Sequence, residues 1–429
     1  MKIYSENKLT KEERFTILRR PSARQSDTGR IVQEVCLTIK QCGDEAVRTY
    51  NKKFDKAEVQ ELRVSAEEFE AAKKSLAPDF IAALNTAAKN IRNFHKSQLN
   101  KTQQITTMEG VVCWREARPI ERVGLYVPAG SAPLPSTVLM LGIPAVLAGC
   151  SQIVLCSPPK TNGSIDPVVL ATAAIIGINE VYKVGGAQAI AAMAYGTETI
   201  PKVDKIFGPG NRYVTAAKQF VSTDPEGAAI DLLAGPSEVL ILSDETANPD
   251  VVAYDLLSQA EHDADAQAVL VTTSELLAKE VLSILPQRAL EFSRNAIVES
   301  SLEHSYILVA NSRESAVRFS NDYAPEHLII NMQNAEAIVP SIMNAGSVFV
   351  GPFAPVTAGD YASGTNHTLP TGGTARWASG VSLDSFLKKV TFQSITKSGL
   401  ESLEPTLTAF ASVEGLQAHA RAVTSRLSK

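Results

Sequence analysis

The sequence predicts an α/β protein whose parallel sheets are covered by helices on both faces. The order and the lengths of the segments along the chain predict this fold class, and the chain length predicts the number of domains. After Gly110, short runs rich in β-branched residues alternate with helical runs, and most of the intervening segments are about ten or more residues long, enough for a crossover helix. The chain length of 429 residues corresponds to roughly three domains of ~150 residues each.

The first part of the chain, from about Asp27 to Asn100, is expected to be helical. Apolar residues recur there at intervals of three to four, which is the spacing of one helix face: Phe80, Leu84, Ala88, Ile91 and Phe94. We interpret these faces as parts of a core.

Nine segments after Gly110 have the composition of strands. They are Val123–Val127, Ile153–Cys156, Val181–Val184, Val203–Phe207, Val239–Leu242, Val269–Thr272, Tyr306–Val309, Leu328–Ile330 and Val348–Val350. A weak internal similarity links ERVGLYVPAG and QIVLCSPP to SEVLILSD and AVLVTTS, with a helical segment inside each pair. This similarity indicates either two related α/β units that meet at a cleft or a chance likeness between α/β segments.

The last part of the chain, beyond Ser382, loses the β pattern. It consists of polar segments with Lys and Ser and a final helical stretch that contains His419. A short tail with few large apolar residues cannot bury itself alone, so we expect it to pack on its own body or on a second subunit.

Charge and cysteine content restrict the class of protein. The net charge of −5, without long basic runs, excludes a surface that tracks nucleic-acid phosphates and favours a small-molecule partner. Five cysteines without a CxxC pair do not form a disulfide framework, which is typical of a reducing cytoplasm. The N-terminus has no apolar signal region and no segment is long enough to cross a bilayer, so we expect a cytoplasmic protein that is not exported.

Four of the six histidines lie in short polar segments beside acidic or amide side chains, as in metal sites and acid–base sites. Gln259 and His262 are three residues apart on a predicted helix that begins at Asn248 or Pro249, so both side chains can reach one ion or form a solvated surface pair. Asp360 and His367 lie in a long irregular segment rich in Gly, Pro, Ser and Thr, which is typical of a functional loop or of a structural Ω-loop.

Two further carboxylate–histidine pairs are candidates. Glu326 and His327 follow Pro325 at the start of a strand, and they can serve one site only if the chain is irregular there. Glu414 and His419 are five residues apart and share a target only if Glu414 lies at or before the helix start, which Gly415 favours.

The sequence contains no GxGxxG motif, but three glycine turns follow predicted strands and lead into helices. They are Gly124–Gly130, Gly185–Gln188 and Phe207–Asn211. Free backbone N–H groups at such helix starts favour a phosphate, so each turn is either a simple tight turn or part of a dinucleotide cleft.

Several long strings occur in a fixed order: GLYVPAGSAPLPSTVLML, VGGAQAIAA, KIFGPGN, AGPSEVL, DLLSQAEHD, PEHLII, AGSVFVG, AGDYASGTNHTLPT and EGLQAHA. With these strings the chain resembles the histidinol dehydrogenase family over essentially its whole length. The resemblance implies oxidation of L-histidinol through L-histidinal to L-histidine, the last steps of histidine biosynthesis, with two NAD⁺ consumed in succession.

The resemblance also implies the ligands of the site. One Zn²⁺ per subunit would be held by Gln259, His262, Asp360 and, from the other subunit of a homodimer, His419. In the family pattern His327 is the general base and Glu326 activates water. The metal ligands and His327 would also contact the substrate, and three further residues would position it: Ser237, His367 and, across the interface, Glu414. The NAD⁺ site would be lined by Tyr126, Gln188 and Asn211.

The implied architecture comprises two incomplete Rossmann-like domains, a small C-terminal domain and an N-terminal arm that takes part in dimerisation. The expected boundaries are 1–22 for the arm, 23–125 with 236–381 for the domain carrying metal and catalytic residues, 126–235 for the nucleotide domain and 382–429 for the dimerisation tail. The cysteines are expected to pack rather than to react.

Three alternatives remain at this point. The nearest is a zinc- and NAD-dependent dehydrogenase of the same superfamily that oxidises another small alcohol, such as a sulfonated diol. A zinc hydrolase would use Glu326 to activate a metal-bound water but would not need the glycine turns. In a non-enzymatic dimer, zinc would only tie the subunits together.

Overall fold

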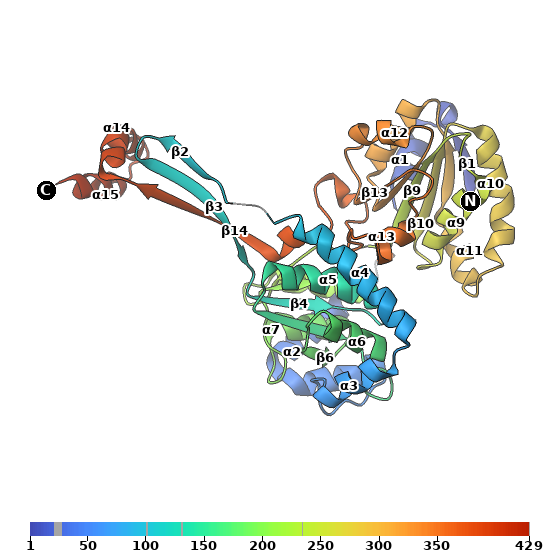
Figure 1. Ribbon diagram of the computed structural model, residues 1–429, viewed down its shortest axis with the longest axis horizontal. Helices are drawn as coiled ribbons and strands as arrows, with labels where there is room; N and C mark the ends of the chain where they lie inside the picture. The colour runs from blue at the N-terminus through green and yellow to red at the C-terminus, as the bar shows by residue number, and fades with distance from the viewer. Residues whose placement is uncertain (21–27, 100–101, 130–131, 234, 429) are drawn as a thin grey trace.

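The chain folds around two parallel sheets and one projecting antiparallel ribbon (Figure 1). The computed structural model describes residues 1–20, 28–99, 102–129, 132–233 and 235–428. The predicted α/β class with parallel sheets is confirmed.

The first sheet has five parallel strands in the order β6-β5-β4-β7-β8. The strands are β4 (Arg122–Tyr126), β5 (Gln152–Ser157), β6 (Val181–Lys183), β7 (Lys205–Phe207) and β8 (Ala229–Ile230). Its crossover helices are α5 (Pro135–Ala148), α6 (Pro167–Ile175), α7 (Gly186–Tyr195) and α8 (Arg212–Thr223). Because helices cover both faces, the central strands are apolar nearly throughout.

The second sheet has six parallel strands in the order β1-β11-β10-β9-β12-β13. The strands are β1 (Lys2–Ser5), β9 (Glu238–Ser243), β10 (Gln267–Thr272), β11 (Tyr306–Val309), β12 (His327–Asn331) and β13 (Ser347–Val350). Its helices are α1 (Lys11–Leu18), α9 (Pro249–Ala260), α10 (Glu275–Ala289), α11 (Asn295–His304), α12 (Arg313–Tyr323) and α13 (Val356–Tyr361). All nine predicted strands are therefore present, in two sheets.

The two sheets share one topology. In each unit the first strand is central, the second and third extend to one side, and the fourth and fifth extend to the other, with β1 added beyond β11. The similar sequence segments form the first and second strands of each unit, β4 and β5 in one and β9 and β10 in the other. This correspondence favours the interpretation of two related units.

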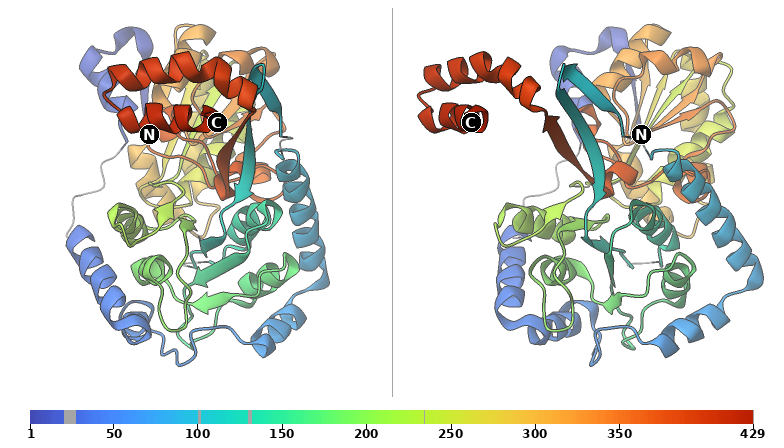
Figure 2. Two further views of the ribbon diagram at one scale, coloured as in Figure 1. Left: turned by 90° about the vertical axis from the view of Figure 1, so that its left-hand side faces the viewer. Right: turned by 60° about the vertical axis from the view of Figure 1, so that its left-hand side comes forward.

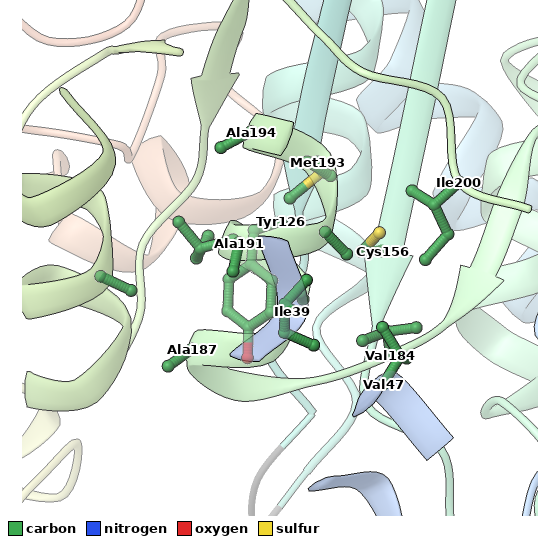
Figure 3. Close-up of a cluster of buried hydrophobic side chains, with 14 of the residues drawn as sticks. Ile39, Val47, Tyr126, Cys156, Val184, Ala187, Ala191, Met193, Ala194 and Ile200 are labelled. Atoms are coloured by element: carbon green, nitrogen blue, oxygen red, sulfur yellow. The ribbon is translucent and has the colours of Figure 1, made fainter. Parts of the chain in front are cut away.

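The N-terminal helices cover the five-stranded sheet. These helices are α2 (Thr28–Tyr50), α3 (Ala66–Ser75) and α4 (Pro78–Lys96). Ile39 and Val47 of α2 lie in one core with Tyr126, Cys156 and Val184 (Figure 3). We expected residues 23–125 to belong with residues 236–381, but the helix α2 packs on the five-stranded sheet instead. The sequence does not reveal this, because an apolar helix face does not show which sheet it covers.

The N-terminal arm also belongs to a sheet. Its strand β1 pairs in parallel with β11, and Ile17 of α1 lies in the core of the six-stranded unit. Residues 1–18 are thus an integral edge of that unit.

The projecting ribbon consists of β2 (Gln104–Met108), β3 (Val111–Pro119) and β14 (Leu387–Ile395), which pair antiparallel in the order β14-β3-β2. The expectation that strand structure fades beyond Ser382 is wrong, because β14 pairs with β3 along nine residues. Its sequence, LKKVTFQSI, is mostly exposed and lacks the apolar run of a buried strand.

Two helices, α14 (Lys397–Val413) and α15 (Gln417–Leu427), form the tip of the ribbon, away from both parallel sheets (Figures 1 and 2). Phe410 is 67% exposed and Val413 is 89% exposed at this tip. We expected the tail to pack either on its own body or on a second subunit. The tip of the tail does not cover the body of its own chain.

No helix in the described ranges is long and apolar enough to cross a membrane. The five cysteines are free, and Cys36 and Cys156 lie in the core of the five-stranded unit. Burial raises the pKa of the Cys36 thiol to about 12, which favours the unreactive thiol form and agrees with a packing role.

Candidate active site

Glu326 and His327 lie at the amino end of β12, beside the amino end of β9. Both side chains are buried, with 5% exposure each. The Glu326 carboxylate accepts a hydrogen bond from the backbone N–H of Glu238 at 2.8 Å, and His327 Nδ1 lies 3.2 Å from the Glu238 carbonyl oxygen. The two catalytic candidates contact each other, with Nδ1 of His327 3.5 Å from Oε2 of Glu326. The strand start therefore brings both side chains to one site, a geometry that the sequence left undecided.

A buried ion pair supports this strand start. The Glu238 carboxylate, 1% exposed, accepts hydrogen bonds from Nε and Nη2 of Arg20 at 2.6 and 2.7 Å. The Arg20 guanidinium lies 3.6 Å from the ring centroid of Tyr323. Sequence reasoning missed this pair because the partners are 218 residues apart, although an acidic residue that opens a buried strand is a usable signal.

Asp360, in α13, faces the same imidazole. Its Oδ1 lies 3.6 Å from Nε2 of His327, and its carbonyl oxygen lies 3.0 Å from Nδ1 of His367. The irregular segment that contains both residues thus includes one short helix. Burial raises the pKa of the Asp360 carboxyl, but the contact with His327 and the nearby histidine charges outweigh burial and hold the pKa below its ordinary value.

The pKa of His327 is set by opposing effects. Burial lowers it, and the Glu326 carboxylate and the contact with Asp360 outweigh burial and raise it. The imidazole therefore lies between two carboxylates, and its protonation state depends on their charge.

Gln259 is buried in the last turn of α9. The helix begins as predicted, with the Asn248 side chain capping it and Pro249 in the first turn. It ends at Ala260, so the exposed His262 lies in the following turn rather than on the helix, and its N–H donates to the Gln259 carbonyl at 3.3 Å.

The types of donor atom near Asp360 fit a divalent metal. The buried amide nitrogen of Gln259 and Nε2 of His327 have no hydrogen-bond partner in the described residues. The charge of His262 acts on Asp360. Within the part of the chain that the structure describes, no three His, Cys, Asp or Glu side chains are grouped to hold an ion. The chain thus offers an amide, an imidazole and a carboxylate as possible ligands of a divalent metal.

Glu414 and His419 are not brought to this place within the chain. Glu414 follows the last residue of α14, Gly415 has a φ of +72°, and His419 is in the first turn of α15. Both side chains are exposed at the tip of the ribbon, far from α9 and α13 (Figure 1). The predicted placement of Glu414 before the helix start agrees with the structure.

Ser237 lies directly before β9, partly buried. It lines a cavity of about 50 Å³ together with Arg20, Glu238 and Gln267. Ser237 is therefore near the strand start that carries the catalytic candidates.

The turns Gly185–Gln188 and Phe207–Asn211 meet the end of β4 at the carboxyl edge of the five-stranded sheet, whereas Gly130 of the first turn lies outside the described residues. The strand order reverses between β4 and β7, and a crevice at such a reversal is the usual ligand position in open α/β sheets. Tyr126 ends β4, and Gly208 follows β7. Asn211 is exposed and caps α8 by accepting hydrogen bonds from the N–H groups of Tyr213 and Val214.

Gly208 is held by a second buried ion pair that sequence reasoning missed. Lys218 and Asp231 contact each other, the Lys218 ammonium donates to the Gly208 carbonyl at 2.9 Å, and the Gly208 N–H donates to Asp231 at 2.8 Å. Gly208 has a φ of +128°, and a Cβ there would lie 2.1 Å from the carbonyl oxygen of Tyr126. The turn between β7 and α8 is thus fixed against the end of β4.

Tyr126 and Gln188 are buried and bonded within the protein. The Tyr126 hydroxyl accepts a hydrogen bond from the N–H of Gly186 at 3.0 Å, and the Gln188 amide donates to Asp55 at 2.9 Å. Burial raises the pKa of the Asp55 carboxyl to about 6. Tyr126 and Gln188 are thus bonded within the protein interior, whereas Asn211 is exposed at the same edge of the sheet.

The segment from Gly351 to Gly373 joins the two units. His367 Nε2 lies 3.3 Å from the Thr137 hydroxyl near the start of α5, and the Asn366 amide donates to the Met140 carbonyl at 2.6 Å. Since α5 begins at the carboxyl edge of its sheet and Asp360 faces the amino end of β12, this edge of the five-stranded sheet adjoins the candidate active site of the other unit.

Known proteins share this sequence and fold. A family model described as Histidinol dehydrogenase matches residues 18–427. The histidinol dehydrogenase of Bacteroides fragilis is 51% identical over 411 residues, 96% of each chain, and that of Vibrio cholerae is 50% identical over 422 residues, 98% of this chain and 97% of the relative. A crystal structure of histidinol dehydrogenase from Elizabethkingia anophelis superposes with a TM-score of 0.96 and 52% identity, covering 100% of this chain and 98% of that one.

Proposed function

Because the chain belongs to the histidinol dehydrogenase family, it oxidises histidinol in histidine biosynthesis, and we propose how its residues perform this activity with NAD⁺ and one Zn²⁺ per subunit. The observation that carries the proposal is the junction of Glu326, His327 and Asp360 at one strand start, next to the crevice of the other unit. Family membership excludes the hydrolase and the non-enzymatic dimer.

The metal site combines Gln259, His262 and Asp360 with His419 of a partner subunit. The support is that these three side chains lie at one end of the six-stranded unit, whereas the chain's own His419 is at the tip of the ribbon. When bound, Zn²⁺ would orient the nitrogen atoms of the substrate and neutralise Asp360, which favours the neutral imidazole that a base needs. Glu414 of the same partner, with Ser237 and His367, would position the substrate.

The chemical steps use the buried pair. His327 takes the alcohol proton as the carbon-bound hydride passes to NAD⁺, which gives histidinal and NADH. Glu326 then takes a proton from the water that adds to the aldehyde, and the carbonyl oxygen takes back the proton held by His327, which gives the hydrate. His327 takes one O–H proton of the hydrate as the hydride passes to a second NAD⁺, and the carboxylic acid that results releases its proton to become the carboxylate. Burial suits both tasks, since bulk water cannot compete for the protons.

The dinucleotide occupies the carboxyl edge of the five-stranded sheet, lined by Tyr126, Gln188 and Asn211. Support comes from the reversal of strand order at β4 and β7 and from the helix starts of α7 and α8 at that edge. This position would direct the nicotinamide toward the substrate site through the Thr137–His367 junction.

The test is turnover of L-histidinol with NAD⁺ by wild-type protein and by Glu326→Gln and His327→Asn, with zinc content measured in parallel. We expect two NADH per histidinol for the wild type and a loss of roughly 10²-fold or more in kcat for each variant with zinc retained. Glu336→Gln, an exposed carboxylate near the same sheet, is the matched control. Full activity in either catalytic variant would contradict the assigned roles.

The alternative substrate, a sulfonated diol, is distinguished by the same assay. The relatives that are about half identical over nearly their whole length are named histidinol dehydrogenase. This similarity favours histidinol as the substrate. NADH formation from the sulfonated diol but not from histidinol would support the alternative.

A further inference from the structure

A second cavity lies in the six-stranded unit, near the carboxyl end of β12. It has a volume of about 190 Å³ and lies between α9, β12 and the segment that leads into α13. Ile329 and Asn331 of β12 line it, as do Val251 and Asp255 of α9. The catalytic candidates occupy the opposite, amino end of the same strand, so this cavity is separate from the candidate active site.

Two polar side chains in the cavity wall have no partner. Asn331 is 6% exposed, and its amide makes no hydrogen bond within the described ranges. The Asp255 carboxylate, partly buried one turn before Gln259, makes neither a hydrogen bond nor an ion pair there. Neither side chain is among the fully buried polar groups that lack a partner, so the amide and the carboxylate still reach water, and a ligand would replace that water.

The rest of the wall is apolar or backbone. It is formed by Val251, Ile329, Gly351, Pro352, Ala354 and Pro355. A cavity of on the order of 150 Å³ holds a molecule the size of benzene, so the space suits a carbon skeleton of about four to six atoms. No cationic side chain is present in this lining to balance Asp255.

We propose that this cavity binds a small organic monocation, a primary ammonium with a short apolar chain, whose charged nitrogen contacts Asp255 and Asn331. The carboxylate supplies the charge, the amide oxygen accepts a further hydrogen bond, and the apolar wall receives the chain. The proposal uses none of the residues that carry the proposed function.

Electrostatics agree with the geometry. Burial alone raises the pKa of the Asp255 carboxyl to about 6. The lining presents no other titratable group to Asp255. The cation should therefore bind more tightly as the pH rises from 5 to 7, because the carboxylate becomes charged over that range.

The proposal also predicts independence from the active site. α9 and β12 carry Gln259 and His327 at their other ends, and Asp360 lies in α13, but none of these three residues lines the cavity. The cation and histidinol should bind at the same time.

The experiment is calorimetric titration of the zinc-loaded protein with n-butylammonium at pH 7.5, with and without saturating histidinol. We expect a Kd on the order of 1 mM, unchanged by histidinol, and binding at least about tenfold weaker for n-butanol, which lacks the charge. Asp255→Asn should weaken butylammonium at least about tenfold, and Ala354→Leu, which fills the cavity but keeps the carboxylate, should do the same.

The control is Glu245→Gln, an exposed carboxylate shortly before α9, which should bind as the wild type does. Equal affinity of wild type and Asp255→Asn, displacement by histidinol, or no detectable binding would each overturn the proposal. Displacement by histidinol would mean that the amine binds in the active site, and it would leave the proposed function intact. The activity of Glu326→Gln tests only the proposed function and does not test the cation site.

Discussion

At the level of single residues, the site depends on charges that are buried with their partners. Glu238 shows this most clearly, because its carboxylate is neutralised by Arg20 while its backbone bonds to Glu326 and His327. Removing one member of such a pair typically costs about 3–5 kcal/mol, since the other charge stays buried alone. The N-terminal arm thus contributes to the catalytic strand start through Arg20.

Asp55 is a partly buried carboxylate with no cationic partner among the described residues, and it makes stability depend on pH. Its folded-state pKa of about 6 lies above the ordinary 3.8, so the folded protein binds this proton more tightly than the unfolded chain does. Its contribution to stability is therefore fully present below about pH 4 and is lost as the pH rises through 6.

We expect Asp55→Asn to be more stable than the wild type at pH 7.5, by about 1–3 kcal/mol, because the amide keeps an acceptor for Gln188 without a buried charge. The gain should shrink toward pH 4. Urea unfolding at several pH values measures it, with the exposed Glu61→Gln as control. A gain that does not change with pH would contradict the assigned titration.

At the level of elements, the sequence reveals strands and helices whose side chains alternate between core and solvent or lie in the core throughout. The nine buried strands and the start of α9 are predictable for this reason. β14 and its partner β3 are not, because a ribbon exposed on both faces has no apolar period.

The candidate site was predictable only in part. Gln259, Glu326, His327 and Asp360 lie in distinctive polar segments, and their roles came from resemblance to a family. The ion pairs Arg20–Glu238 and Lys218–Asp231 join residues that only the fold brings together, so no local pattern reveals them.

The turn between β7 and α8 gives a test of the dinucleotide crevice. Gly208→Ala would place a Cβ against the Tyr126 carbonyl, so the turn has to move. We expect the KM for NAD⁺ to rise about tenfold or more while the KM for histidinol changes little. The control is Gly149→Ala, which also has a positive φ, +82°, but no atom within 4 Å of the added Cβ. Equal KM values for NAD⁺ in both variants would place the dinucleotide elsewhere.

At the level of the whole molecule, the ribbon separates His419 from the other proposed metal ligands of its own chain. A tip with Phe410 and Val413 largely exposed is suited to cover another surface. In the two-fold dimer that we propose, each ribbon would reach the partner's site, and the two sites would be completed reciprocally.

The most direct test of this shared site is a purified heterodimer of one His262→Asn chain and one His419→Asn chain, carrying different tags. If His419 acts across the interface, one site of the heterodimer loses both histidines and the other site keeps both. The heterodimer should then show about half of the wild-type kcat per dimer. Both homodimeric variants should be nearly inactive. A heterodimer as inactive as the two homodimers would contradict the account, because it would mean that each chain completes its own site.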